Sequence, residues 1–215
     1  MKSRPSAQNP AVRAWGASAP HARVTVLAVH GRGQTPEYMR TESERLTEAI
    51  GSAGARIRFV APCAPGDSWY PHPFLESIDT NQPALDNSIG TIGQVLDGIV
   101  SDCPVVLWGF SQGACLISHY LLVRQQTVAG AVICTGGYIG QGDAPKPATR
   151  LHGLPVIIRS VQQDPFVPPA RVRETGQALA RAGCSVDLRI DSGAEHVITD
   201  EAIVTMAALL EEIQL

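Results

Sequence analysis

The sequence is poor in several features that mark specialised classes of protein. Only 17% of its residues are charged and the formal net charge is −3. The composition therefore gives no indication of a basic surface that would bind nucleic acid or an anionic membrane. No apolar run approaches the ~20 residues that a membrane-spanning helix needs. The five cysteines include no Cys-x-x-Cys pair, and no cluster of His, Cys or Asp has the spacing of metal ligands. We therefore expect no nucleic-acid partner, no integral membrane contact, no metal and no other cofactor.

The N-terminal segment also lacks the continuous apolar stretch of a secretory signal. Residues 1–21 are rich in Pro, Ser and Ala, and we expect a loose leader or one weak edge strand there. Three cysteines lie in apolar runs and are expected to be small buried side chains: Cys115, Cys134 and Cys184. These features favour a reduced, cytoplasmic protein. Residues 22–215 are expected to form one domain, since a chain of this size buries roughly 70% of its unfolded surface.

What the sequence does contain is a regular alternation of apolar, β-branched runs with helix-like segments. We expect strands at 24–29, 56–60, 104–108, 128–134, 155–161 and 186–190. We expect helices at 35–50, 87–99, 114–122, 169–182 and 199–213, with Thr35, Asn87 and Thr199 as N-caps. Buried strands that alternate with helices are typical of an α/β fold, with a mostly parallel sheet covered on both faces. The Gly/Pro-rich stretch 135–154 is too short to hold a lid domain.

The most informative motif is Gly109-Phe110-Ser111-Gln112-Gly113, which joins an apolar strand to an apolar helix. A Gly-x-Ser-x-Gly in that position is typical of the nucleophile elbow of serine hydrolases. The serine needs a strained turn to project its hydroxyl, and a Cβ two residues to either side would collide with neighbouring backbone. The turn also leaves the N–H of Gln112 unpaired at the start of a helix. An ordinary tight turn is the alternative interpretation.

A serine nucleophile needs a base, and histidine is the usual one. His196 follows the last expected strand and precedes the last helix, where a loop can bring its imidazole over the serine. His30 is expected to support the loop that follows the first strand, and His119 lies about two helical turns beyond Ser111. His72 lies in a long loop that could face the same cleft, whereas His21 and His152 have little supporting context.

The acid of such a triad stands between the serine and the histidine in chain order. Asp164 follows the strand at 155–161 and precedes Pro165, so it should lie at the same edge of the sheet as Ser111. Asp143, in the Gly-rich loop, is the competing candidate, while Asp187 and Asp191 are less well placed.

Taken together, these motifs resemble the phospholipase/carboxylesterase family of α/β-hydrolases, which includes acyl-protein thioesterases and small bacterial carboxylesterases. The resemblance rests on His30–Gly33, Ser68–Pro71, Gly109–Gly113, Asp164–Pro168 and Gly193–His196. It implies the α/β-hydrolase fold, a triad of Ser111, Asp164 and His196, and an oxyanion hole formed by the backbone N–H groups of Arg32 and Gln112. Arg32 stands where the thioesterase branch usually has an apolar residue.

Aromatic side chains are few, 5% of the residues, yet several fall close to these motifs. Trp69, Tyr70 and Phe74 are expected to form an apolar wall beside the serine, with Phe166 as a further substrate contact. The alternative for Trp69 and Phe74 is that they only fill the core.

The sequence thus predicts a serine carboxylesterase that acts on short-to-medium acyl esters of small molecules through an acyl-enzyme intermediate. An acyl-protein thioesterase or lysophospholipase, which would need a longer apolar groove, is the alternative enzyme. A non-catalytic ligand-binding member of the fold is the alternative from another class.

Overall fold

A single seven-stranded sheet organises the molecule. The computed structural model describes residues 10–99, 103–124, 126–147 and 150–213. The strands are β1 (Val12–Gly16), β2 (Val24–Val29), β3 (Ile57–Pro62), β4 (Val105–Phe110), β5 (Gly130–Cys134), β6 (Pro155–Val161) and β7 (Ser185–Asp191). Their spatial order is β1-β3-β2-β4-β5-β6-β7, and every neighbouring pair is parallel except β1 with β3. The expected α/β fold with a mostly parallel sheet is confirmed, and β4 lies at its centre.

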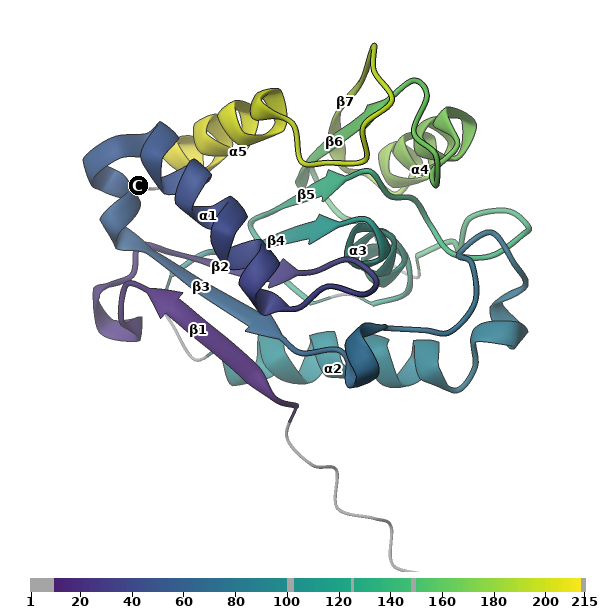
Figure 1. Cartoon of the computed structure of the whole chain (residues 1–215), viewed down its shortest axis with the longest axis horizontal. Coiled ribbons are helices and arrows are strands. Elements are labelled where there is room, and N and C mark those ends of the chain that lie inside the picture. The colour runs from purple at the N-terminus through teal and green to yellow at the C-terminus, as the bar shows by residue number, and fades with distance from the viewer. Residues whose placement is uncertain (1–9, 100–102, 125, 148–149, 214–215) are drawn as a thin grey trace, which may run out of the picture.

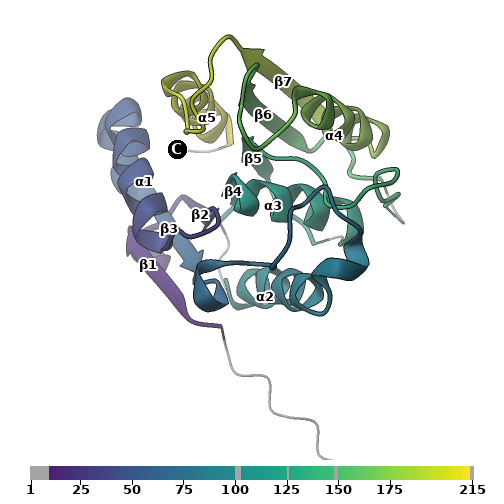
Figure 2. The same cartoon turned by 45° about the vertical axis from the view of Figure 1, so that its right-hand side comes forward.

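Five α-helices cover the two faces of this sheet: α1 (Pro36–Ile50), α2 (Ala84–Gly98), α3 (Gln112–Val123), α4 (Pro169–Arg181) and α5 (Asp200–Ile213). Helices α1 and α5 pack on one face, and α2, α3 and α4 on the other (Figures 1 and 2). The central strands β2, β4 and β5 are buried almost throughout, which explains their continuous apolar sequences. The edge strand β7 alternates between exposed and half-buried residues.

Helix α2 begins at Ala84, three residues earlier than expected. Gln82, not Asn87, satisfies its first turn: the Gln82 side chain accepts a bond from the Asp86 N–H (3.2 Å) and donates one to the Asp86 carboxylate (3.0 Å). At α5 the expected cap is present, since the Thr199 hydroxyl accepts a hydrogen bond from the Ala202 N–H (3.2 Å). Thr35 precedes α1 but makes no side-chain capping bond.

The N-terminal part of the described chain lies along the edge of the sheet. Strand β1 pairs antiparallel with β3, and Trp15 stacks on Phe59 with ring centroids 5.6 Å apart. Residues 1–9 of the expected leader lie outside the described residues. Among the described residues, no helix is long and apolar enough to cross a membrane. Nor does that part of the chain contain an α-helical insertion beyond the five helices above.

Candidate active site

Ser111 stands alone between the end of β4 and the start of α3, at the sharp turn that the sequence predicts. Its φ of +54° lies in a region that non-glycine residues seldom adopt, which indicates local strain. The two flanking glycines are required by packing. A Cβ on Gly109 would lie 2.8 Å from the backbone N of Ala114, and one on Gly113 would lie 2.2 Å from the carbonyl oxygen of Val29. This close approach lets the strand turn into the helix with the serine at its tip.

The structure brings Ser111, His196 and Asp164 together from three separate loops. His196 Nε2 lies 2.8 Å from Ser111 Oγ, and His196 Nδ1 lies 2.8 Å from Asp164 Oδ2. The side chain of Asp164 has no exposed surface and that of His196 is 14% exposed. The imidazole lies between the rings of Phe110 (5.1 Å) and Phe166 (4.9 Å), which restrict its orientation.

Asp164 is held in its ionised form by its hydrogen bonds. Burial by itself would raise the pKa of this carboxyl group. The hydrogen bond with His196 and those from the backbone N–H groups of Phe166 and Val167 outweigh that effect, so the pKa of Asp164 is lowered. An ionised Asp164 accepts a hydrogen bond from the N–H at His196 Nδ1, which leaves Nε2 as the acceptor facing the Ser111 hydroxyl.

Two backbone amides beside the serine are available to an incoming oxygen. The N–H of Gly31 donates to Gln34 Oε1 (2.9 Å), whereas those of Arg32 and Gln112 have no hydrogen-bond acceptor within the described ranges. Gly31 packs against Ser111, since a Cβ placed on it would lie 3.1 Å from the Cβ of Ser111. The arrangement can therefore offer two donors to one developing negative charge.

The competing histidines and carboxylates have other surroundings. His30 is fully buried, its pKa is lowered by burial, and its Nε2 accepts the N–H of Ala64 (3.3 Å), which anchors the loop after β2. His119 is also buried, and burial lowers its pKa to about 4. Asp143 is exposed and lines a different cavity, beside Lys146 and Arg181.

A cavity of about 540 Å³ opens beside Ser111. Three of the four aromatic residues expected at the substrate, Tyr70, Phe74 and Phe166, line it, as do Arg32 and Gln112. Phe166 is 67% exposed and stands at the mouth. Further lining residues that the sequence analysis did not expect at the cavity are Gln34, Pro73, Phe110, Cys115 and Val167. Cys115 could have been found from its spacing, since four residues after Ser111 is the same helix face.

Trp69 is not among the lining residues of this cavity. It is 1% exposed, and its indole N–H donates to the carbonyl of His30 (2.8 Å) while its ring lies 5.1 Å from that imidazole. Its backbone N–H donates to Gln112 Oε1 (3.0 Å). The structure therefore places Trp69 behind the cavity, as a support for the loops around it.

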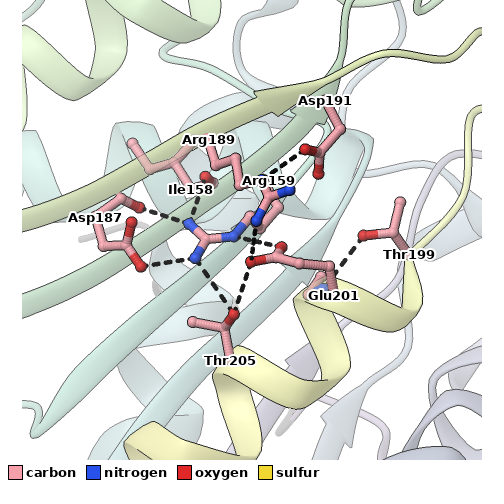
Figure 3. Close-up of polar contacts among 9 residues, drawn as sticks. Ile158, Arg159, Asp187, Arg189, Asp191, Thr199, Glu201 and Thr205 are labelled. Atoms are coloured by element: carbon pink, nitrogen blue, oxygen red, sulfur yellow. Dashed lines mark hydrogen bonds and ion pairs between the residues drawn. The ribbon is translucent and has the colours of Figure 1, made fainter.

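An ion-pair network around the buried Arg159 joins the elements next to the Asp164 and His196 loops (Figure 3). Arg159 on β6 is 4% exposed, and its guanidinium binds Asp187 on β7 and Glu201 on α5, both at 2.6 Å. Asp164 follows β6 and His196 lies between β7 and α5, so the network joins the three elements that flank both residues. The sequence analysis did not identify this network. Arg159 could have indicated it, because an arginine within an apolar strand is seldom buried unless it is paired.

Comparison with known proteins identifies the family of this chain and its fold. The sequence profile of the phospholipase/carboxylesterase family matches residues 16–214. A phospholipase/carboxylesterase from Dyadobacter fermentans is similar in structure, with a TM-score of 0.85 and 29% identity over 94% of this chain and 96% of that one. A search of curated proteins found no significant match.

Two more distant structures show the shared fold alone. A carboxylesterase from Mesorhizobium loti has a TM-score of 0.73 and 21% identity, covering 96% of each chain. Esterase PE8 has a TM-score of 0.76 and 20% identity, covering 96% of this chain and all of that one. Because the family profile spans nearly the whole sequence and the fold is that of its members, the chain belongs to the phospholipase/carboxylesterase family of α/β-hydrolases.

Proposed function

We propose that this protein is a serine carboxylesterase that hydrolyses short-to-medium acyl esters of small molecules. The observation that carries the proposal is the continuous hydrogen-bonded chain from Asp164 through His196 to Ser111, which ends at an open, mostly apolar cavity. A binding protein would need neither this chain nor the strained serine. Membership of an esterase family supports the same reaction class.

The reaction begins when Ser111 Oγ attacks the ester carbonyl carbon while its proton passes to His196 Nε2. The carbonyl oxygen becomes negatively charged and accepts hydrogen bonds from the Arg32 and Gln112 amides, each worth ~3 kcal/mol in such sites. When the C–O bond to the alcohol breaks, the alcohol oxygen takes the proton from His196 and leaves. Water then attacks the acyl-serine with His196 again as base, which releases the carboxylic acid and restores the Ser111 hydroxyl.

The cavity favours acyl chains of limited length. Tyr70, Pro73 and Phe74 form one side of it, close to Ser111. A buried methylene gains ~0.8 kcal/mol until the end of a pocket is reached, beyond which a longer chain stays in water or clashes. We expect kcat/KM on p-nitrophenyl esters to rise from acetyl to a maximum at short-to-medium length, and to fall for palmitoyl.

The first test is labelling with a fluorophosphonate, which reacts covalently with an activated serine. The wild-type protein should be labelled, and Ser111→Ala should not be labelled while its thermal unfolding stays close to that of the wild type. Loss of such a nucleophile costs on the order of 10⁶-fold in kcat. Absence of labelling in the folded wild type would favour a ligand-binding protein, and a preference for palmitoyl thioesters or lysophospholipids would favour the thioesterase or lysophospholipase alternative.

A further inference from the structure

The segment that forms one side of the cavity has no regular secondary structure to hold it. We call residues 69–74 the pocket wall, since Tyr70, Pro73 and Phe74 within it line the cavity. The preceding short helix ends at Asp67 and the next begins at Ile78. Strands and helices fix a backbone through their own hydrogen bonds, so the shape of this wall must be set in another way.

Side chains from elsewhere in the chain supply the missing bonds. The backbone carbonyls of five consecutive wall residues, 69 to 73, each accept a hydrogen bond from a side chain. In order along the wall, the donors are Ser88, Gln112, Arg32, Arg32 again and Asn81. Three of these donors, Ser88, Gln112 and Asn81, are buried residues, whereas Arg32 is exposed.

Arg32 holds two successive carbonyls with one planar group. Its Nη1 donates to the carbonyl of Pro71 (2.7 Å) and its Nη2 to that of His72 (2.9 Å). Its Cζ also lies 5.7 Å from the centroid of the Tyr70 ring. Within the described part of the chain no carboxylate forms an ion pair with Arg32. The guanidinium thus binds the pocket wall through two hydrogen bonds, and a lysine could not reproduce this bidentate contact.

We propose that Arg32 is a positioning residue that sets the acyl-chain preference, because its guanidinium fixes the pocket wall relative to the oxyanion loop. The proposal rests on the esterase function proposed above. Gln112 acts in the same way from the other side, since its side chain donates to the Tyr70 carbonyl (2.8 Å) and accepts the Trp69 N–H (3.0 Å). The two residues whose amides face the reacting carbonyl therefore also hold the surface against which the acyl chain lies.

This coupling has a consequence that depends on the substrate. An acetyl group is too short to gain much from the wall, whereas a hexanoyl chain draws its binding energy from apolar contact along it. When the Arg32 contacts are lost, the carbonyls of Pro71 and His72 lose their hydrogen bonds, whereas the bonds to the carbonyls of residues 69, 70, 73 and 74 remain. Longer chains should then lose more rate than short ones, although the Arg32 amide itself remains in place.

The experiment compares Arg32→Met and Arg32→Lys with Arg173→Met, a change at another exposed arginine on α4. The readout is the ratio of kcat/KM for p-nitrophenyl hexanoate to that for p-nitrophenyl acetate. We expect the ratio to fall by about tenfold in Arg32→Met, the lower end of what one methylene contributes in a pocket. The fall should be smaller in Arg32→Lys, which can still donate to one carbonyl at a time, and absent in Arg173→Met. Hydrogen exchange of the backbone amides in residues 69–74 should accelerate in the same order.

An unchanged ratio in Arg32→Met, with a wild type that hydrolyses both esters, would overturn the role of Arg32 and leave the esterase function standing. An equal loss of kcat/KM on both esters would also overturn the role of Arg32 in acyl preference, since such a loss would place the effect at the reacting carbonyl. If Arg32→Met does not fold, Arg32→Lys carries the test with the same ratio and the same exchange measurement. A wild type that hydrolyses neither ester would instead contradict the proposed function.

Discussion

Replacement of Asp164 by asparagine tests the proposed mechanism with almost no change in shape. In the wild type, Asp164 Oδ1 accepts two backbone hydrogen bonds, from Phe166 and Val167, both at 2.9 Å. Its other oxygen, Oδ2, faces His196 Nδ1. An asparagine at this position can direct its amide oxygen either to the two backbone N–H groups or to His196 Nδ1, and its NH₂ group then takes the other place.

The two backbone N–H donors determine this orientation. If the amide oxygen faced His196, the NH₂ group would meet two N–H donors and both would lose their acceptor, at ~1–3 kcal/mol each. The oxygen should therefore stay with the backbone, and the NH₂ group should face the imidazole. His196 Nδ1 must then become the acceptor, which moves the ring proton to Nε2, opposite Ser111 Oγ. In that tautomer the imidazole cannot take the serine proton.

We expect Asp164→Asn to lower kcat by on the order of 10⁴-fold, which corresponds to ~5.5 kcal/mol in the barrier. The assay is hydrolysis of p-nitrophenyl butyrate, with nitrogen NMR of the imidazole to report its tautomer. The matched control is Asp143→Asn, at the exposed carboxylate that was the other candidate for the acid of the triad. This variant should retain wild-type activity. Activity of Asp164→Asn within tenfold of the wild type, or greater damage from Asp143→Asn, would refute the reasoning.

Two further predictions concern stability. The pKa of Asp164 is lower in the folded chain than the ~3.9 of an unfolded one, so its carboxylate stabilises the fold above that pH and the contribution disappears as the pH falls through the folded value. The difference in Tm between the wild type and Asp164→Asn should accordingly shrink below about pH 4; a constant difference would contradict the linkage. In the network around Arg159, Asp187→Asn combined with Glu201→Gln leaves the buried cation without a carboxylate partner and should lower the free energy of unfolding in urea by ~1–3 kcal/mol, because both carboxylates are partly exposed to solvent. Arg159→Met leaves only partly exposed carboxylates and should cost less, so the reverse order would be evidence against the network.

The sheet and the nucleophile turn could be predicted because their signals are local. Strands β2 and β6 match their expected ranges because buried parallel strands are continuous apolar runs. Ser111, Asp164 and His196 each follow a parallel strand of the sheet, and parallel strands bring those ends to one edge. The start of α2 was missed because its cap is the side chain of Gln82, a residue outside the usual capping set.

The sequence indicated which segment forms the wall of the cavity, but not which of its aromatic side chains line it. Trp69, Tyr70 and Phe74 are equally apolar in sequence, yet Trp69 lies behind the cavity and the other two line it. Their directions depend on backbone bonds donated from Arg32 and Gln112, which lie about 40 residues away on either side. No periodicity or cap within the segment encodes those partners.

This difference separates two kinds of information in the chain. The groups proposed to carry out the chemistry lie at strand ends, where the sheet itself determines their distance, so the reaction class can be inferred from patterns of a few residues. The groups proposed to select the substrate lie on a segment whose carbonyls are bonded by side chains from α2, from α3 and from the loop after β2. A substitution at any of those donors can change which acyl chain fits without touching Ser111, His196 or Asp164. Substitutions should therefore change the acyl preference more readily than the reaction itself, and we expect the largest such change at position 32, whose side chain holds two successive carbonyls of the pocket wall.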